Sequence, residues 1–173
     1  MKHISLRQLN DFRRAGLRPQ VVGCFVKDRQ VLFVYVKKHK LWQLPQGGVE
    51  NNETLEAALE REMTEELGPS FMKHAAKKRH PMGEDVLQFP KKAHNTRDLR
   101  TDSGKSIKMR GKKYFFFAIP VGKKTLRLRE TEFNDYRWLG YIDALNLTDT
   151  IYQKEKQKKT QGILKNLRQH GWL

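Results

Sequence analysis

Residues 47–68 read GGVENNETLEAALEREMTEELG, a glycine-rich loop followed by a helical pattern. The glycine pair permits a backbone turn that residues with a Cβ resist, and Asn52 is placed to cap the first helical turn. Gly68 and the following Pro69 predict where the helix ends. Apolar side chains recur at every fourth position between these ends, at Leu55, Leu59, Met63 and Leu67. This spacing predicts one buried helix face.

Three glutamates lie beside that apolar face, at Glu62, Glu65 and Glu66. Their spacing of i, i+3 and i+4 is expected to bring the carboxylates into one neighbourhood, where like charges repel unless solvent or a cation separates them. Hard oxygen ligands of this kind suit Mg²⁺ or Mn²⁺. Arg61 lies four residues before Glu65 and is placed to hold its carboxylate. The alternative interpretation is a solvated, glutamate-rich helix face.

The spacing of the whole segment favours the metal-binding interpretation. Gly47 is followed after five residues by Glu53, and after seven more by residues 61–68, REMTEELG. This pattern resembles the Nudix box, the signature of hydrolases that cleave nucleoside diphosphates linked to another moiety. The resemblance implies an α/β fold, an α/β/α sandwich with a mixed central sheet. Pro69 departs from the aliphatic residue usual in the family, which concerns packing beyond the helix more than chemistry.

The resemblance also implies roles for individual residues. The implied metal ligands are the carboxylates of Glu62, Glu65 and Glu66 and the backbone carbonyl of Gly47. Glu53 and Arg61 are expected to support catalysis by orienting the loop and the helix. A carboxylate must also accept the proton of the attacking water. Glu65 and Glu66 within the box and Glu132 outside it are the candidates for that base, and Glu132 is alternatively an extra metal ligand.

The composition is that of a basic, globular protein. The chain has 173 residues, of which 38% are hydrophobic, enough for one domain with a substantial core. Its 35 Lys and Arg against 19 Asp and Glu give a net charge of +16, which predicts attraction to polyanions such as RNA. Residues 72–113 hold 13 basic and four acidic side chains, whereas residues 47–68 are acidic. The alternative is a basic composition without a specific partner.

Neither a membrane span nor a disulfide is predicted. Cys24 is the single cysteine and lies in the apolar run of residues 21–26, which favours a buried, reduced thiol. The apolar run that begins at Tyr114 is too short to cross a bilayer, and the first residues lack an apolar signal region. We therefore expect a cytoplasmic protein.

The segments around the box predict a mixed sheet with helices. Residues 5–14 predict a short N-terminal helix, and residues 150–170 predict a basic terminal helix that Gly171 closes. A helical turn is expected to begin at residues 142–145. Strands are expected at residues 20–26 and 31–36, which form a hairpin, at 41–45, at 112–120, and at the end of 131–139, where Tyr136 and Trp138 share one face.

Residues 70–110 are polar and basic, and they are broken by Pro81, Gly83, Pro90 and Gly104. They predict long loops with at most a short strand at residues 85–89. This basic insertion and a short N-terminal extension, residues 1–17, do not follow the family pattern. The chain as a whole, residues 1–173, is expected to form a single Nudix domain.

Four stretches narrow the resemblance to RNA pyrophosphohydrolases and the related dinucleoside polyphosphate hydrolases. They are residues 18–23 (RPQVVG), 42–48 (WQLPQGG), 111–115 (GKKYF) and 132–138 (EFNDYRW). By this resemblance Arg18 and Lys113 are expected to contact phosphates, and Tyr114 to lie near the bound base, with a core position as its alternative. Gln46 supports this branch, because many other Nudix enzymes have glycine there, and by the same resemblance it is assigned to substrate binding.

The main hypothesis is a Mg²⁺- or Mn²⁺-dependent hydrolase that removes pyrophosphate or phosphate from the 5′ end of triphosphorylated RNA. One alternative is a dinucleoside polyphosphate or nucleotide housecleaning hydrolase whose basic surface is incidental. Another is an RNA-binding module on an inactive Nudix scaffold. That scaffold would normally lack one or more box glutamates, and here all are present.

Overall fold

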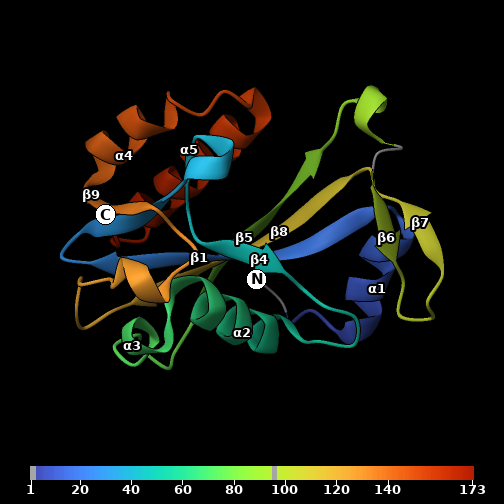
Figure 1. Ribbon diagram of the computed structural model, residues 1–173, viewed down its shortest axis with the longest axis horizontal. Coiled ribbons are helices and arrows are strands. Elements are labelled where there is room, and N and C mark those ends of the chain that lie inside the picture. The colour runs from blue at the N-terminus through green and yellow to red at the C-terminus, as the bar shows by residue number, and fades with distance from the viewer. Residues whose placement is uncertain (1–2, 95–96) are drawn as a thin grey trace.

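A mixed β-sheet forms the centre of the protein (Figure 1). The computed structural model describes residues 3–94 and 97–173. The strands of this sheet are β1 (Leu17–Lys27), β2 (Gln30–Val36), β3 (Leu41–Gln43), β4 (Gln46–Gly48), β5 (His80–Gln88), β8 (Gly111–Pro120) and β9 (Asp135–Leu139). They lie in the order β3-β2-β1-β8-β5, with β4 also paired to β1 and β9 to β2. β1 and β8 are parallel, and the other pairs are antiparallel. The expected mixed sheet is therefore confirmed.

Helices cover both faces of this sheet (Figure 1). The helices are α1 (Leu6–Arg14), α2 (Leu55–Leu67), α3 (Pro69–Met72), α4 (Tyr141–Thr148) and α5 (Lys154–Gln169), with short 3-10 turns at Lys37–His39, Lys91–Ala93 and Leu128–Glu130. Apolar residues of α1, α2 and α3 pack with Phe115 and Phe117 on one face. Those of α4 and α5 pack with Tyr114 and Phe116 on the other. This arrangement confirms the α/β/α sandwich.

The apolar stripe of α2 is buried as predicted. Its members are each at most 2% exposed: Leu55, Leu59, Met63 and Leu67. The cap prediction is wrong, because Thr54 caps the helix by accepting the Ala57 N–H at 3.2 Å. Asn52 instead adopts a left-handed turn conformation with φ of 59°. Two further residues therefore precede the first helical turn.

The other local predictions near the box are largely confirmed. β1 and β2 form the expected hairpin, with Asp28 and Arg29 at positive φ in its turn. Cys24 is fully buried, and burial raises the pKa of its thiol. Tyr136 and Trp138 share one face and pack on the same apolar cluster as α2. The strand expected at residues 41–45 ends at Gln43 as β3, and the start of the expected glycine loop, Gln46–Gly48, forms β4.

Residues 70–110 contain more regular structure than predicted. β5 is a nine-residue edge strand paired with β8, and β6 (Asp98–Arg100) pairs with β7 (Ser106–Lys108) in a separate hairpin. A register irregularity between Pro81 and Gly83 lets the strand include both of these breakers. Met82 and Leu87 are the buried side chains of β5, which explains why its apolar sequence pattern is weak.

The buried side chain of Arg13 joins α1, the loop before α2 and the β6–β7 hairpin. Its guanidinium is 1% exposed and donates to the carbonyls of Val49 at 3.0 Å and Glu50 at 2.7 Å. It also pairs with Asp102 at 3.3 Å, in the turn of the hairpin. Asn10 supports the same turn by accepting the Asp102 N–H at 3.0 Å. The N-terminal helix and the hairpin are thereby fixed to the glycine loop.

No helix within residues 3–94 and 97–173 is long and apolar enough to cross a membrane. The terminal helix α5 is slightly shorter than expected, and Gly171 follows it at φ of 77°. The Trp172 N–H then donates to the Leu167 carbonyl at 3.0 Å. This closure of the helix matches the predicted role of Gly171.

We expect Arg13→Met to lower the free energy of unfolding by about 3 kcal/mol, because two carbonyls and a carboxylate lose their buried charged donor. Urea denaturation followed by circular dichroism measures the change. Arg14→Met, on the same helix but exposed, is the matched control and should cost less than about 0.5 kcal/mol. Equal losses in the two variants would contradict the proposed importance of the Arg13 contacts.

Candidate active site

Two adjacent glycines bring the loop before α2 into contact with charged side chains. β4 pairs with β1 so that Gly47 lies opposite Val21. A Cβ on Gly47 would overlap the carboxylate of Glu62, and a Cβ on Gly48 would overlap the guanidinium of Arg18. A Cβ at either position would therefore force the charged end of the neighbouring side chain to move. An acidic side chain of α2 and a basic side chain of β1 thus lie against neighbouring residues of one strand.

Arg61 holds the loop and the acidic face of α2 together. Its guanidinium binds both carboxylate oxygens of Glu53, at 2.9 and 2.8 Å, and the Gly48 carbonyl at 3.0 Å. It also donates to Glu62 at 2.8 Å and to Glu65 at 3.3 Å. The hydrogen bond from Arg61 lowers the pKa of Glu53, and the Glu50 N–H also binds that carboxylate at 2.8 Å. This geometry matches the orienting roles expected of Glu53 and Arg61.

Glu66 is a partly buried carboxylate that lies between the loop and Glu132. Its Oε2 accepts the Gln46 N–H at 2.9 Å, and its backbone carbonyl accepts the Glu132 N–H at 3.2 Å. Burial raises the pKa of Glu66 to about 8; the Gln46 N–H opposes this shift, and the charges of Glu62 and Glu132 add to it. Three of the predicted acidic residues therefore interact electrostatically.

The predicted metal ligands are neighbours, but they do not form an assembled ligand group in this conformation. Across residues 3–94 and 97–173, no three His, Cys, Asp or Glu side chains are arranged to hold a metal ion. Arg61 instead binds Glu62 and Glu65. The donor set nevertheless fits a divalent cation, because Glu66 is a partly buried carboxylate beside two others and carboxylate oxygens are the ligands that Mg²⁺ and Mn²⁺ prefer.

The two adjacent lysines of β8 have different surroundings. Lys113 is 7% exposed, pairs with Glu84 at 2.8 Å and lies 5.2 Å from the ring centre of Phe12. Lys112, on the opposite face of the strand, lines a cavity together with Arg18. The phosphate contact predicted for Lys113 therefore has no support in this geometry, whereas Lys112 is well placed for it.

Tyr114 lies in the core instead of at an open surface. It is 4% exposed and packs near Phe116 in the layer beneath α5, with ring centres 6.0 Å apart. Burial raises the pKa of its hydroxyl. Of the two interpretations of Tyr114, the structure favours the core position over the one beside a bound base.

α5 contributes a cation that sequence reasoning missed. Lys156 Nζ donates to Gln43 Oε1 at 2.7 Å, and the Gln46 side chain donates to the same oxygen at 3.3 Å. Burial lowers the pKa of Lys156 to about 8; nearby Lys112 adds to the shift and Glu66 opposes it. The lysine-rich sequence around Lys156 does not distinguish it from its neighbours. Its position follows from how the helix packs on the sheet.

A cavity of about 320 Å³ adjoins the glycine loop, and five of its eleven lining residues are basic. We call this cavity the basic pocket. Its cationic lining consists of Arg13, Arg18, Arg97, Arg100 and Lys112. The acidic face of α2 and the basic pocket thus lie on either side of the strand that carries Gly47 and Gly48.

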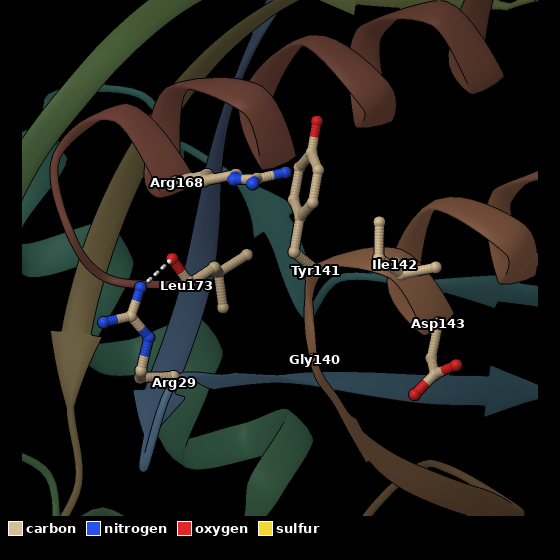
Figure 2. Close-up of a pocket in the computed structure, with 7 residues that line it drawn as sticks. All are labelled: Arg29, Gly140, Tyr141, Ile142, Asp143, Arg168 and Leu173. Carbon is tan, nitrogen blue, oxygen red and sulfur yellow. Dashed lines mark hydrogen bonds between the residues drawn. The ribbon is translucent and has the colours of Figure 1, made fainter.

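A second cavity, of about 370 Å³, lies between α4 and the end of the chain (Figure 2). Arg168 lies over the ring of Tyr141, 4.4 Å from its centre, and Arg29 donates to the Leu173 carbonyl at 3.1 Å. None of the predicted site residues lines this cavity. The first contact joins α5 to α4, and the second joins the end of the chain after α5 to the β1–β2 turn.

Comparison with known proteins supports the sequence resemblance. The NUDIX domain family matches residues 17–160. An RNA pyrophosphohydrolase of a Nitratiruptor species is 30% identical over 133 residues, covering 76% of this chain and 77% of that protein. The RNA pyrophosphohydrolase of Aeromonas hydrophila is 31% identical over 135 residues, covering 73% and 71%.

Solved structures with the same fold show low sequence identity. A Caenorhabditis elegans Ap4A hydrolase complex aligns with a TM-score of 0.60 and 14% identity, covering 89% of this chain and 97% of that one. An Escherichia coli dihydroneopterin triphosphate pyrophosphohydrolase aligns with a TM-score of 0.56 and 16% identity, covering 83% and 95%. These likenesses concern the fold alone. The family match and the curated relatives show that the chain belongs to the Nudix hydrolase family.

Proposed function

We propose that this Nudix hydrolase removes pyrophosphate or phosphate from the 5′ end of triphosphorylated RNA, with Mg²⁺ or Mn²⁺ as cofactor, in the cytoplasm. The observation that carries the proposal is the contact of two neighbouring loop glycines with opposite charges. Gly47 lies against Glu62 of the acidic face, and Gly48 lies against Arg18 of the basic pocket. A polyanion bound beside the acidic site is therefore within reach of the basic side chains of the pocket.

The choice of RNA as substrate is supported by the relatives and by the charge of the chain. The curated relatives named above are RNA pyrophosphohydrolases. A net charge of +16 favours a long polyanion over a small one, because each neutralised phosphate adds to the affinity. Hydrolysis of dinucleoside polyphosphates is the second candidate, since one structural neighbour is an Ap4A hydrolase.

The proposed reaction requires positive charge and an oriented nucleophile, because the anionic oxygens of a polyphosphate repel incoming water. When bound, Mg²⁺ or Mn²⁺ supplies charge neutralisation and Lewis acidity. The residues that would hold the cation are Glu62, Glu65, Glu66 and Glu132, with the Gly47 carbonyl. The Gln46 N–H fixes one oxygen of Glu66, and Arg61 orients Glu62 and Glu65.

One carboxylate must take the proton of the attacking water. Glu65 and Glu132 are exposed, whereas Glu66 is partly buried, so all three remain candidates for different positions of the water. Gln46 and Arg18 are proposed to contact the substrate polyphosphate, and Lys112 lies beside Arg18 in the basic pocket. Lys156 is placed to extend this positive surface from α5.

A time course with Mg²⁺ and then Mn²⁺ tests the proposal. The substrates are 5′-triphosphate RNA, diadenosine tetraphosphate and ATP, and the released phosphate species are identified. We expect the RNA to lose pyrophosphate or phosphate with the highest kcat/KM. Faster hydrolysis of the dinucleotide would assign the enzyme to nucleotide metabolism, and RNA binding without hydrolysis under either metal would indicate an inactive scaffold.

Glu65→Gln is expected to lower kcat by about 10²-fold or more, because it removes a charge proposed to hold the cation or accept the proton. Titration of free Mn²⁺ by electron paramagnetic resonance should show weaker binding if Glu65 is a ligand. The fold should persist, since this side chain is 57% exposed. Glu56→Gln, at an exposed position in the first turn of the same helix, is the control. A near-normal rate for Glu65→Gln would refute its assignment.

Gly47→Ala is expected to lower kcat/KM by about 10²-fold, because its Cβ would displace the Glu62 carboxylate. Steady-state kinetics and thermal unfolding are compared in the same preparation, and activity should fall more than stability. Gly162→Ala in α5 is the control, since its Cβ meets no atom within 4 Å. If Gly47→Ala kept full activity, the contact between Gly47 and Glu62 would be irrelevant to catalysis.

A further inference from the structure

The basic pocket is built from α1, the loop before α2, the β6–β7 hairpin with its flanking residues, and the central strands. Arg13 comes from α1, and Arg97 and Arg100 come from the β6–β7 hairpin. Arg18 and Lys112 complete the cationic lining from the central strands. Glu50 and Asp98 are the acidic residues of this lining. The cations therefore outnumber the carboxylates in a cavity of about 320 Å³.

Three cations of the pocket have no carboxylate partner within the described parts of the chain. Within those parts, no ion pair is formed by Arg97, Arg100 or Lys112. The other two cations have acidic neighbours: Arg13 pairs with Asp102, and Arg18 lies 4.0 Å from Glu50. Asp98 is already paired with Lys108, at 2.8 Å. The pocket therefore presents unbalanced positive charge to solvent.

The surroundings of Lys112 indicate the same imbalance. Burial lowers the pKa of Lys112 to about 8, and the positive charges of Arg18 and Arg97 add to the shift. The positive charges of Arg18 and Arg97 disfavour the charged form of Lys112, and an anion bound in the pocket would stabilise that form. The ligand best matched to several guanidinium groups and an ammonium is a phosphate group, because arginine binds phosphate oxygens in pairs.

The wall of the pocket is fixed to the glycine loop. The Asn51 side chain donates to the Arg100 carbonyl at 3.3 Å. Arg13 joins the carbonyls of Val49 and Glu50 to Asp102, in the turn of the same hairpin. Leu99 and Met109 are buried beneath it. The arginines are thus carried by a supported strand next to the proposed reaction centre.

The hairpin extends this positive charge beyond the pocket. Lys105, Lys108 and Arg110 are all exposed on it, and Lys108 is the one paired with Asp98. A nucleoside triphosphate or dinucleotide would end within the site, whereas an RNA strand continues into solvent. A row of exposed cations that leads away from the site suits a continuing phosphodiester backbone.

We propose that the basic pocket binds a phosphodiester group of the RNA strand just downstream of the 5′ nucleotide, with Arg97 and Arg100 as the specificity-determining contacts and Lys112 at the base of the pocket. This inference rests on the proposed function, since it assigns a second part of the same substrate. The hairpin then favours RNA over free nucleotides without taking part in the bond cleavage.

Binding without turnover tests the pocket separately from the reaction. A 5′-monophosphorylated RNA oligonucleotide is titrated with wild-type protein and with Arg97→Ala/Arg100→Ala in EDTA, and fluorescence anisotropy is recorded over a series of salt concentrations. The double variant should bind about tenfold more weakly, and the slope of log Kd against log salt should fall by about 1 for each arginine removed. Lys154→Ala/Lys165→Ala, at two exposed sites on α5, is the charge-matched control and should leave both quantities unchanged.

Hydrolysis distinguishes the phosphodiester from the reacting polyphosphate. For wild type and double variant, kcat/KM is measured on 5′-triphosphate RNA, ATP and diadenosine tetraphosphate. The ratio of RNA to ATP should fall at least about fivefold in the variant. An equal loss on all three substrates would overturn the inference and place the polyphosphate in the pocket. An unchanged affinity and salt slope would also overturn it. If wild type cleaved only the dinucleotide, the proposed function would fail, whereas the EDTA titration would still report on RNA binding by the pocket.

Discussion

The geometry of the active site depends on the guanidinium of Arg61. It binds a carboxylate of the loop, Glu53, and two carboxylates of the helix, Glu62 and Glu65, together with the Gly48 carbonyl. Without a cation among them, the carboxylates of the helix face would repel one another. Because Arg61 balances part of this charge, the loop can approach α2 closely enough for Glu62 to lie against Gly47. The same contacts hold the acidic groups close to one another before a metal ion binds.

The fold and much of the box could be predicted from the sequence, because their signals are local. The four-residue repeat of Leu55 to Leu67 identified the buried face of α2, and the resemblance of residues 61–68 to a known motif identified Arg61 as an orienting group. Local patterns were less informative where two neighbouring residues can exchange roles. Lys112 and Lys113 are chemically identical, and only the register of β8 decides which one lines the pocket and which one pairs with Glu84.

The features that could not be predicted are those formed by contacts between distant parts of the chain. Asp102 lies 89 residues after Arg13, and no spacing in the sequence links the two. Lys156 and Gln43 are 113 residues apart. The hairpin of β6 and β7 has few apolar residues, so its order rests on side chains such as Leu99 and Met109 that become buried only in the folded protein. Composition alone therefore suggested loops.

The adjacent glycines Gly47 and Gly48 separate a negatively charged side of the site from a positively charged side. Gly47 lies against Glu62 and Gly48 lies against Arg18, so two neighbouring residues of one strand have opposite charges on its two sides. An anionic substrate is repelled by the carboxylates until a cation is present, but the basic pocket attracts it in either case. In the proposed reaction, this field orients a polyanion with its chain toward Arg18 and Lys112 and leaves the acidic face for the cation and the bond to be cleaved. The hydrogen bond from Arg61 holds the Glu62 carboxylate on the acidic side of this arrangement, and the lack of a Cβ at Gly47 leaves room for it.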